Sequence, residues 1–171
     1  DGNYRFEGER GPADFADLFG DKQTLLVYSY MFGAKRERPC PMCTSLLGAW
    51  DGEARDIQQR VALAVIAGAP IGRLLAFKQE RGWRDLPLYT DLNGDYTRDF
   101  RGIAPDGSDM PSLNVFTRRD GTRIYYALAS ERLMAAVRPD VVLSMDPGYT
   151  PRGELYDACL AAGVDTITWN A

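Results

Sequence analysis

The most informative part of this chain is residues 24–47, which read TLLVYSYMFGAKRERPCPMCTSLL. Residues 24–32 are almost all apolar or aromatic, which predicts a central strand covered on both faces. The polar and basic residues 33–39 then predict a loop. A helical pattern starts at Cys40, and its apolar members recur at alternating spacings of four and three residues. This stripe consists of Cys43, Leu47, Trp50, Ala54, Ile57 and Val61.

Two cysteines stand at the expected helix start, in Cys40-Pro41-Met42-Cys43. If the helix begins at Cys40, both sulfurs lie on its first turn, close enough to form a disulfide with each other. The backbone N–H groups there lack partners inside the helix, and the positive end of the helix dipole favours a thiolate. We therefore expect Cys40 to be the exposed nucleophile. Cys43, on the inward stripe, is expected to be the resolving thiol.

The elements that follow extend the alternation of strands and helices. We expect a second buried strand over 61–67, a helix from about Pro70 to Gly82, and a shorter strand over 86–90. This order predicts a parallel core. Two further strands, over 113–117 and 123–127, flank Asp120-Gly121 and predict an antiparallel hairpin. The remaining residues predict helices over 130–138 and 155–162, with a loop over 139–153.

Length and composition describe an ordinary soluble protein. The 171 residues suffice for a single domain over 1–171 that needs no disulfide for stability. No apolar run reaches membrane-spanning length, and the net charge of −4 argues against binding nucleic acid, so we expect neither membrane nor nucleic acid as a partner. No signal-peptide pattern is visible, although the sequence starts at Asp1, and we expect a cytoplasmic protein.

The chain contains no histidine, which excludes the usual hydrolase triads and most zinc sites. Three cysteines are too few for a four-thiolate metal site within one chain, so the close pair fits redox chemistry better than metal binding. We expect neither a metal nor another cofactor. The third cysteine, Cys159, shares an apolar helical face with Leu155, Ala158 and Ala162, where a thiol usually acts as a small buried apolar group.

The order of elements is that of an α/β thioredoxin-like fold, a central mixed sheet with a parallel core, a C-terminal antiparallel hairpin and helices on both faces. In that fold a cis-proline begins the first hairpin strand and faces the disulfide, and Met110-Pro111 stand at this place. We predict that Pro111 is cis, with a trans proline at a strand start as the alternative. Backbone groups of Met110 would then pair with an extended substrate, alongside Pro41 and Met42.

The chain resembles the thioredoxin-like family catalogued as domain of unknown function 899, over about residues 18–156. The matching residues are Leu26-Val27-Tyr28, Met31-Phe32-Gly33, Cys40-Pro41-Met42-Cys43, Ala69-Pro70, Gly82-Trp83, Asp99-Phe100, Val115-Phe116 and Pro151-Arg152-Gly153-Glu154. The resemblance implies a thioredoxin-like fold and a dithiol-disulfide oxidoreductase activity. Ser29 departs from the family pattern, which has a histidine beside the tyrosine of the strand. The aspartate that thioredoxins bury behind the two cysteines is also absent, and Tyr28 occupies that strand position.

The leading hypothesis is a thiol-disulfide oxidoreductase that acts on a protein or small-molecule disulfide. A reducing partner then converts the protein's own disulfide back to the dithiol. A peroxiredoxin-like peroxidase is weaker, because Glu37 stands where that family has a threonine or serine. A thioredoxin-fold binding module and a dimer that shares a metal between two cysteine pairs remain as alternatives. The basic residues Lys35, Arg36 and Arg38 either lower the pKa of Cys40 or belong to a solvated loop. The oligomeric state is left open.

Overall fold

The computed structural model describes residues 4–119, 123–126, 141–145 and 165–169. The chain divides into two compact units, residues 1–125 and 126–171, and each is described by itself. The expectation of a single domain over 1–171 stays a prediction. Among the helices of the described residues, none combines the length and the apolar character that a bilayer crossing requires.

The first unit is built on a seven-stranded sheet with the order β2-β1-β5-β4-β3-β6-β7. Strands β3, β4 and β5 are parallel, whereas β6 pairs antiparallel with β3, and β1 pairs antiparallel with β2 and β5. The predicted mixed sheet with a parallel core is therefore confirmed. The strand bounds are β1 (Arg5–Gly8), β2 (Gly11–Asp14), β3 (Thr24–Ser29), β4 (Ala62–Ala67), β5 (Leu88–Asp91), β6 (Ser112–Arg119) and β7 (Arg123–Tyr126).

The two long helices begin and end close to the predicted residues. Helix α1 (Pro41–Arg60) has a proline at its first position, where no backbone N–H is needed, and it ends where Val61 turns extended. Helix α2 (Ile71–Arg81) follows Pro70 and ends at Gly82, whose φ of 68° is a left-handed conformation that glycine adopts without strain. Pro70 therefore precedes the helix, and Gly82 terminates it.

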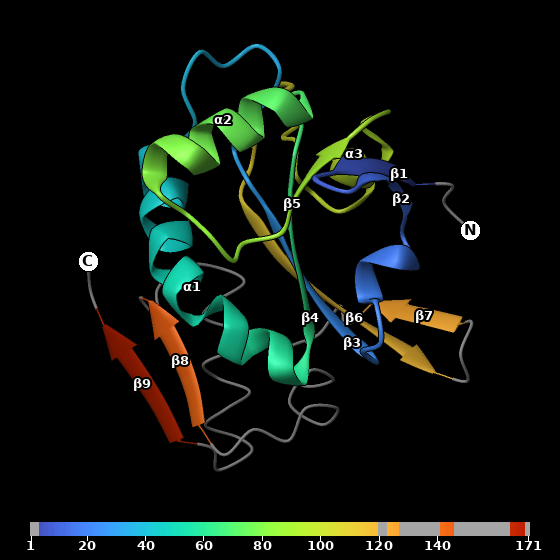
Figure 1. The fold of residues 1–171 in the computed structure, drawn as a ribbon, viewed down its shortest axis with the longest axis vertical. Coiled ribbons are helices and arrows are strands. Elements are labelled where there is room, and N and C mark those ends of the chain that lie inside the picture. Colours follow the sequence, from blue (N-terminus) through green and yellow to red (C-terminus); the bar gives the residue numbers. More distant parts are fainter. Residues whose placement is uncertain (1–3, 120–122, 127–140, 146–164, 170–171) are drawn as a thin grey trace. The chain divides into compact units, whose positions relative to one another are not determined.

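Alternate residues of β3 face opposite sides of the sheet. Tyr28 and Tyr30 belong to one buried cluster with Cys43, Leu47 and other residues of α1 and α2, so both helices cover this face. In Figure 1 the two helices lie along the same side of β3, β4 and β5. This arrangement places the start of α1 beside the end of β3, which is where the two cysteines lie.

The opposite face is covered by shorter elements around Tyr96 of helix α3 (Asp95–Asp99). Asn114 of β6 donates a hydrogen bond to the Tyr96 hydroxyl over 3.1 Å, which ties α3 to this face. The 3-10 helix η1 (Asp17–Phe19) contributes buried Leu18 and Phe19. Aromatic rings packed around Tyr96 belong to Tyr4, Phe6, Phe15, Phe100 and Phe116. Helical segments thus lie on both faces, as predicted.

Several elements differ from the sequence predictions. The β1–β2 pair and α3 lie in stretches for which no regular structure was expected. The second unit contains a parallel pair, β8 (Val141–Met145) and β9 (Asp165–Trp169), so the loop predicted over 139–153 is wrong at residues 141–145, and its other residues lie outside the described ones. The apolar residues Val141, Val142 and Leu143 pair with a strand far along the chain, which local sequence does not reveal. The predicted helices over 130–138 and 155–162, Cys159 and the Asp120-Gly121 turn lie outside the described residues.

Candidate dithiol site

The two cysteines lie at the amino end of α1, as predicted. Cys40 is the residue that precedes the helix, and its backbone N–H donates to the Met31 carbonyl over 3.0 Å. This hydrogen bond fixes the helix start against the segment that follows β3. Cys40 is partly exposed, whereas Cys43 is only 3% exposed, and both are free thiols joined by a side-chain hydrogen bond. The predicted difference in exposure between the two sulfurs is confirmed.

The surroundings of Cys40 favour its thiolate. Partial burial acts against ionisation and is the largest single influence. Hydrogen bonds from the backbone N–H and the thiol of Cys43, and from the backbone N–H of Met42, act in the opposite direction. Together with the positive charge of Arg36, they hold the pKa of Cys40 below its ordinary value. The unpaired N–H groups of the first helical turn therefore supply most of the stabilisation, as their position in the sequence predicted.

The surroundings of Cys43 favour the neutral thiol. Burial is the main cause and raises the pKa of Cys43, and the neighbouring Cys40 raises it further. The Tyr28 side chain and the Met31 backbone N–H hydrogen-bond the Cys43 sulfur and partly offset this effect. The two sulfurs of one helical turn thus have pKa values displaced in opposite directions.

A chain of hydroxyl groups supports the backbone beneath Cys40. Thr44 Oγ1 donates to the Cys40 carbonyl over 2.8 Å, and the Tyr30 hydroxyl lies 2.7 Å from the same Thr44 oxygen. Because the single hydroxyl hydrogen of Thr44 is already donated, Tyr30 is the donor in the second bond. Burial raises the pKa of Tyr30 to about 12, so its hydroxyl keeps this proton at neutral pH.

The loop that leads to Cys40 is held by the side chain of Arg73 on α2. Its guanidinium donates to the carbonyls of Ala34, Arg36 and Glu37 within 3.1 Å. The same group lies over the Phe32 ring, 4.9 Å from its centroid. Figure 1 shows this loop, between β3 and α1, arching past α2. One partly exposed guanidinium thus binds three backbone carbonyls of the loop.

Asp109 joins this loop to the segment that precedes β6. Its Oδ2 accepts hydrogen bonds from the Gly33 backbone N–H at 2.9 Å and from Arg36 Nε at 2.7 Å. A methyl group on Gly33 would meet Asp109 Oδ1 at 2.5 Å, so only glycine allows this approach. Arg36 therefore pairs with Asp109 while it also acts on Cys40.

The residues predicted to contact a substrate are all exposed. Pro41 and Met42 lie on the first turn of α1, and Met42 is 75% exposed. Met110 is 44% exposed and Pro111 is also exposed, next to Ser112, which pairs with Ser29 at the end of β3. Both pairs of residues thus lie toward the end of the sheet where α1 begins. Whether Pro111 is cis stays a prediction.

Sequence reasoning missed Asp109, Arg73 and the Tyr30–Thr44 pair. A lone aspartate and a lone arginine carry no spacing signal, because their partners belong to a loop that is distant in sequence. Thr44 carried a weak signal, since a threonine one turn after a helix start often bonds the carbonyl four residues before it. Of the three basic loop residues, Arg36 acts on Cys40, whereas Arg38 pairs with Glu80 on α2.

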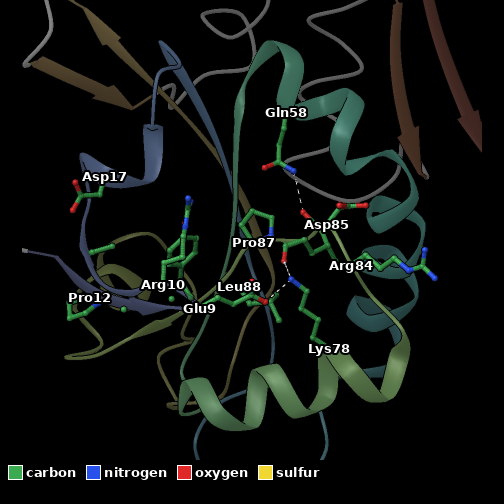
Figure 2. Close-up of a pocket in the computed structure, with 15 residues that line it drawn as sticks. Glu9, Arg10, Pro12, Asp17, Gln58, Lys78, Arg84, Asp85, Pro87 and Leu88 are labelled. Atoms are coloured by element: carbon green, nitrogen blue, oxygen red, sulfur yellow. Dashed lines mark hydrogen bonds and ion pairs between the residues drawn. The ribbon is translucent and has the colours of Figure 1, made fainter.

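A separate cavity of about 560 Å³ lies between the β1–β2 turn and residues 84–89 (Figure 2). Lys78 reaches it from α2 and donates to Glu9 Oε1 at 2.7 Å and to the Leu86 carbonyl at 2.8 Å. Arg10, Arg84, Asp17 and Asp85 also line it, so charges of both signs are present. Neither Cys40 nor Cys43 is among the described residues that line this cavity.

Comparison with known proteins agrees with this architecture. A family model described as "Bacterial protein of unknown function (DUF899)" matches residues 1–153. No curated protein sequence is similar to the chain.

Several solved structures share the fold at low sequence identity. Peroxidoxin BcpB from Mycobacterium tuberculosis gives a TM-score of 0.53 at 20% identity, with 78% of this chain and 90% of that chain covered. The reduced 2-Cys peroxiredoxin of Plasmodium vivax gives a TM-score of 0.52 at 15% identity, with 79% of this chain and 90% of that chain covered. The exposed lipoprotein thioredoxin of Streptococcus pneumoniae gives a TM-score of 0.51 at 10% identity, with 94% of this chain and 99% of that chain covered. The predicted thioredoxin-like fold is confirmed, and at these identities the likeness concerns the fold alone.

Proposed function

This chain belongs to the bacterial protein family of unknown function DUF899, and we propose that it is a thiol-disulfide oxidoreductase. One observation carries the proposal: two free thiols on one helical turn have pKa values displaced in opposite directions. In such a pair, each thiol performs a different step of disulfide exchange. The accessible thiolate of Cys40 attacks, and the buried thiol of Cys43 stays neutral until the attack has occurred.

The reaction proceeds in two exchanges. Cys40 thiolate attacks one sulfur of a substrate disulfide, which forms a mixed disulfide and releases the other substrate sulfur as a thiolate that takes a proton from water. Cys43 then loses its proton, and its thiolate attacks the Cys40 sulfur. The second substrate thiolate leaves and takes up that proton. The substrate gains two electrons, the enzyme is left with a Cys40–Cys43 disulfide, and a reducing dithiol partner restores it.

The substrate is a protein or small-molecule disulfide that docks on exposed apolar side chains. Met42 and Met110 offer flexible surfaces that adapt to different partners, and Pro41 and Pro111 complete the surface around Cys40. A cis bond before Pro111 would turn the Met110 backbone toward an extended substrate. We place this activity in the cytoplasm, where cellular reductants keep such thiols ready to react.

The proposal is tested with insulin as polypeptide disulfide and glutathione disulfide as small substrate, with dithiothreitol as the reductant. Wild-type protein should accelerate reduction of at least one of them, and Cys40→Ser should lose this activity. Cys43→Ser should instead accumulate a covalent mixed disulfide at Cys40, visible by intact-protein mass spectrometry. Absence of both turnover by the wild type and an adduct on Cys43→Ser would overturn the proposal.

Peroxide consumption separates this activity from that of a peroxidase. Position 37 carries an exposed glutamate, whose carbonyl is bound by Arg73, rather than a hydroxyl side chain aimed at the reacting sulfur. We therefore expect hydrogen peroxide to be consumed no faster than by an ordinary exposed thiol. Rapid peroxide turnover without disulfide reductase activity would assign the chain to the other reaction class.

A further inference from the structure

Tyr28 lies directly beneath the resolving cysteine. Its side chain is on the face of β3 that α1 covers, and it is 7% exposed. Its ring meets the Trp50 ring edge-to-face, with centroids 5.7 Å apart. Trp50 and Cys43 share the inward stripe of α1, so the Trp50 contact holds the tyrosine ring along this stripe. The side chain of Tyr28 is hydrogen-bonded to Cys43.

We propose that Tyr28 is a positioning residue for Cys43: its hydroxyl donates a hydrogen bond to the Cys43 sulfur and stabilises the thiolate that attacks the mixed disulfide. The inference rests on the proposed disulfide exchange and deepens it by assigning a role in its second step. Tyr28 does not act on the substrate, and it does not take part in the attack by Cys40.

The need for such a donor follows from burial. A thiolate formed at Cys43 is shielded from water, so it must be stabilised by groups of the protein. In the described part of the chain, Tyr28 and the backbone N–H of Met31 hydrogen-bond this sulfur, and Cys40 and Tyr30 lie close to it. Tyr30 directs its hydrogen to Thr44. Cys40 accepts the hydrogen of the Cys43 thiol and is itself bonded to the substrate in the mixed disulfide, so among the described side chains Tyr28 is the one that donates to the Cys43 sulfur.

The hydrogen bond from Tyr28 does not change which groups lose and gain protons in the second exchange. Cys43 gives up its thiol proton, which ends on the departing substrate thiolate, and the Cys40–Cys43 bond replaces the bond between Cys40 and the substrate. Tyr28 keeps its own proton throughout and only donates a hydrogen bond. Removal of the hydroxyl should thus slow the second exchange and leave the first one intact.

The test uses reduced full-length protein and limiting dithiobis-nitrobenzoate, a chromogenic disulfide. Attack by Cys40 releases one coloured thiolate in a first phase, and attack by Cys43 releases another in a second phase. For Tyr28→Phe we expect an unchanged first phase and a second phase slowed by about tenfold at neutral pH, as for loss of a hydrogen bond to a charged group. The midpoint of the pH profile of the second phase should move to higher pH.

Tyr89→Phe is the matched control, because this half-buried tyrosine lines the separate cavity and loses a hydroxyl far from either sulfur. Both of its phases should equal those of the wild type. A ring-fluorinated tyrosine at position 28, a stronger donor, should move the midpoint of the second phase to lower pH, and this comparison holds even if Tyr28→Phe fails to fold. A second phase that is insensitive to both changes overturns the inference. Absence of a second phase in the wild type instead contradicts the proposed function itself.

Discussion

Arg36 Nε lies 2.7 Å from Asp109 Oδ2, and this ion pair joins the loop before Cys40 to the residue before Met110. The two segments are far apart in sequence, yet each flanks one part of the candidate site. Since Asp109 also accepts the Gly33 N–H, one carboxylate positions both the nucleophile loop and the predicted substrate segment. The first two predictions concern this junction.

Replacing Gly33 by alanine should destabilise the protein by about 1 kcal/mol, the usual net cost of a lost hydrogen bond. The added methyl would lie 2.5 Å from Asp109 Oδ1 and displace the carboxylate from Arg36. Thermal and urea unfolding measure the change. Gly52→Ala is the control, since nothing lies within 4 Å of its Cβ position in α1, and helix propensity should stabilise it by about 0.5–1 kcal/mol. Equal stabilities of the two variants would contradict this packing.

Arg36→Gln should raise the pKa of Cys40, because it removes a positive charge that favours the thiolate. Alkylation of Cys40 by iodoacetamide at neutral pH should slow by about twofold to threefold, the effect of a partly exposed charge. The difference should shrink at high salt. Lys35→Gln, an exposed neighbour on the same loop, should leave the rate unchanged. A larger effect of Lys35 than of Arg36 would argue for general loop charge instead.

The two thiols should titrate in order, with Cys40 first. Because the pKa of Cys40 is lowered and that of Cys43 is raised, a rise in pH deprotonates Cys40 below the range of an ordinary thiol and Cys43 above it. Near neutral pH, iodoacetamide should modify Cys40 at least about tenfold faster than Cys43, measured by peptide mass spectrometry over a pH series. Cys40→Ser and Cys43→Ser each remove one thiol of the pair and give the profile of the other, and the opposite order of modification would refute the assignment.

Arg73→Met should loosen the loop over residues 33–39. It removes hydrogen bonds to three loop carbonyls and the contact with the Phe32 ring, so we expect a loss of about 1–2 kcal/mol in unfolding free energy. Limited proteolysis within this loop should also accelerate. Arg55→Met removes the ion pair that this exposed residue of α1 forms with Asp85 and should change neither measurement. Identical proteolysis patterns for both variants would show that Arg73 does not order the loop.

Local sequence was sufficient for the elements that carry the thiols. The helical spacing of Cys43, Leu47 and Ala54 lies where the pattern placed it, and α2 starts and ends within one residue of the predicted positions. The strand predicted over 24–32 is present as β3 but ends at Ser29. The exposure of Cys40 and the burial of Cys43 followed from the same periodicity. These features depend on neighbours within a few residues, which is the range over which a pattern is informative.

The contacts that surround the thiols were decided by tertiary structure. Asp109 meets Gly33 because β6 pairs with β3 in a register that places Ser112 opposite Ser29, and neither residue reveals this pairing. Tyr28 reaches Cys43 only because α1 crosses its face of the sheet. Strand β8 likewise depends on β9, a distant partner in the chain. Contacts between distant segments are set by strand register and helix packing, and short-range periodicity shows which face of an element is buried but not which distant residue it meets.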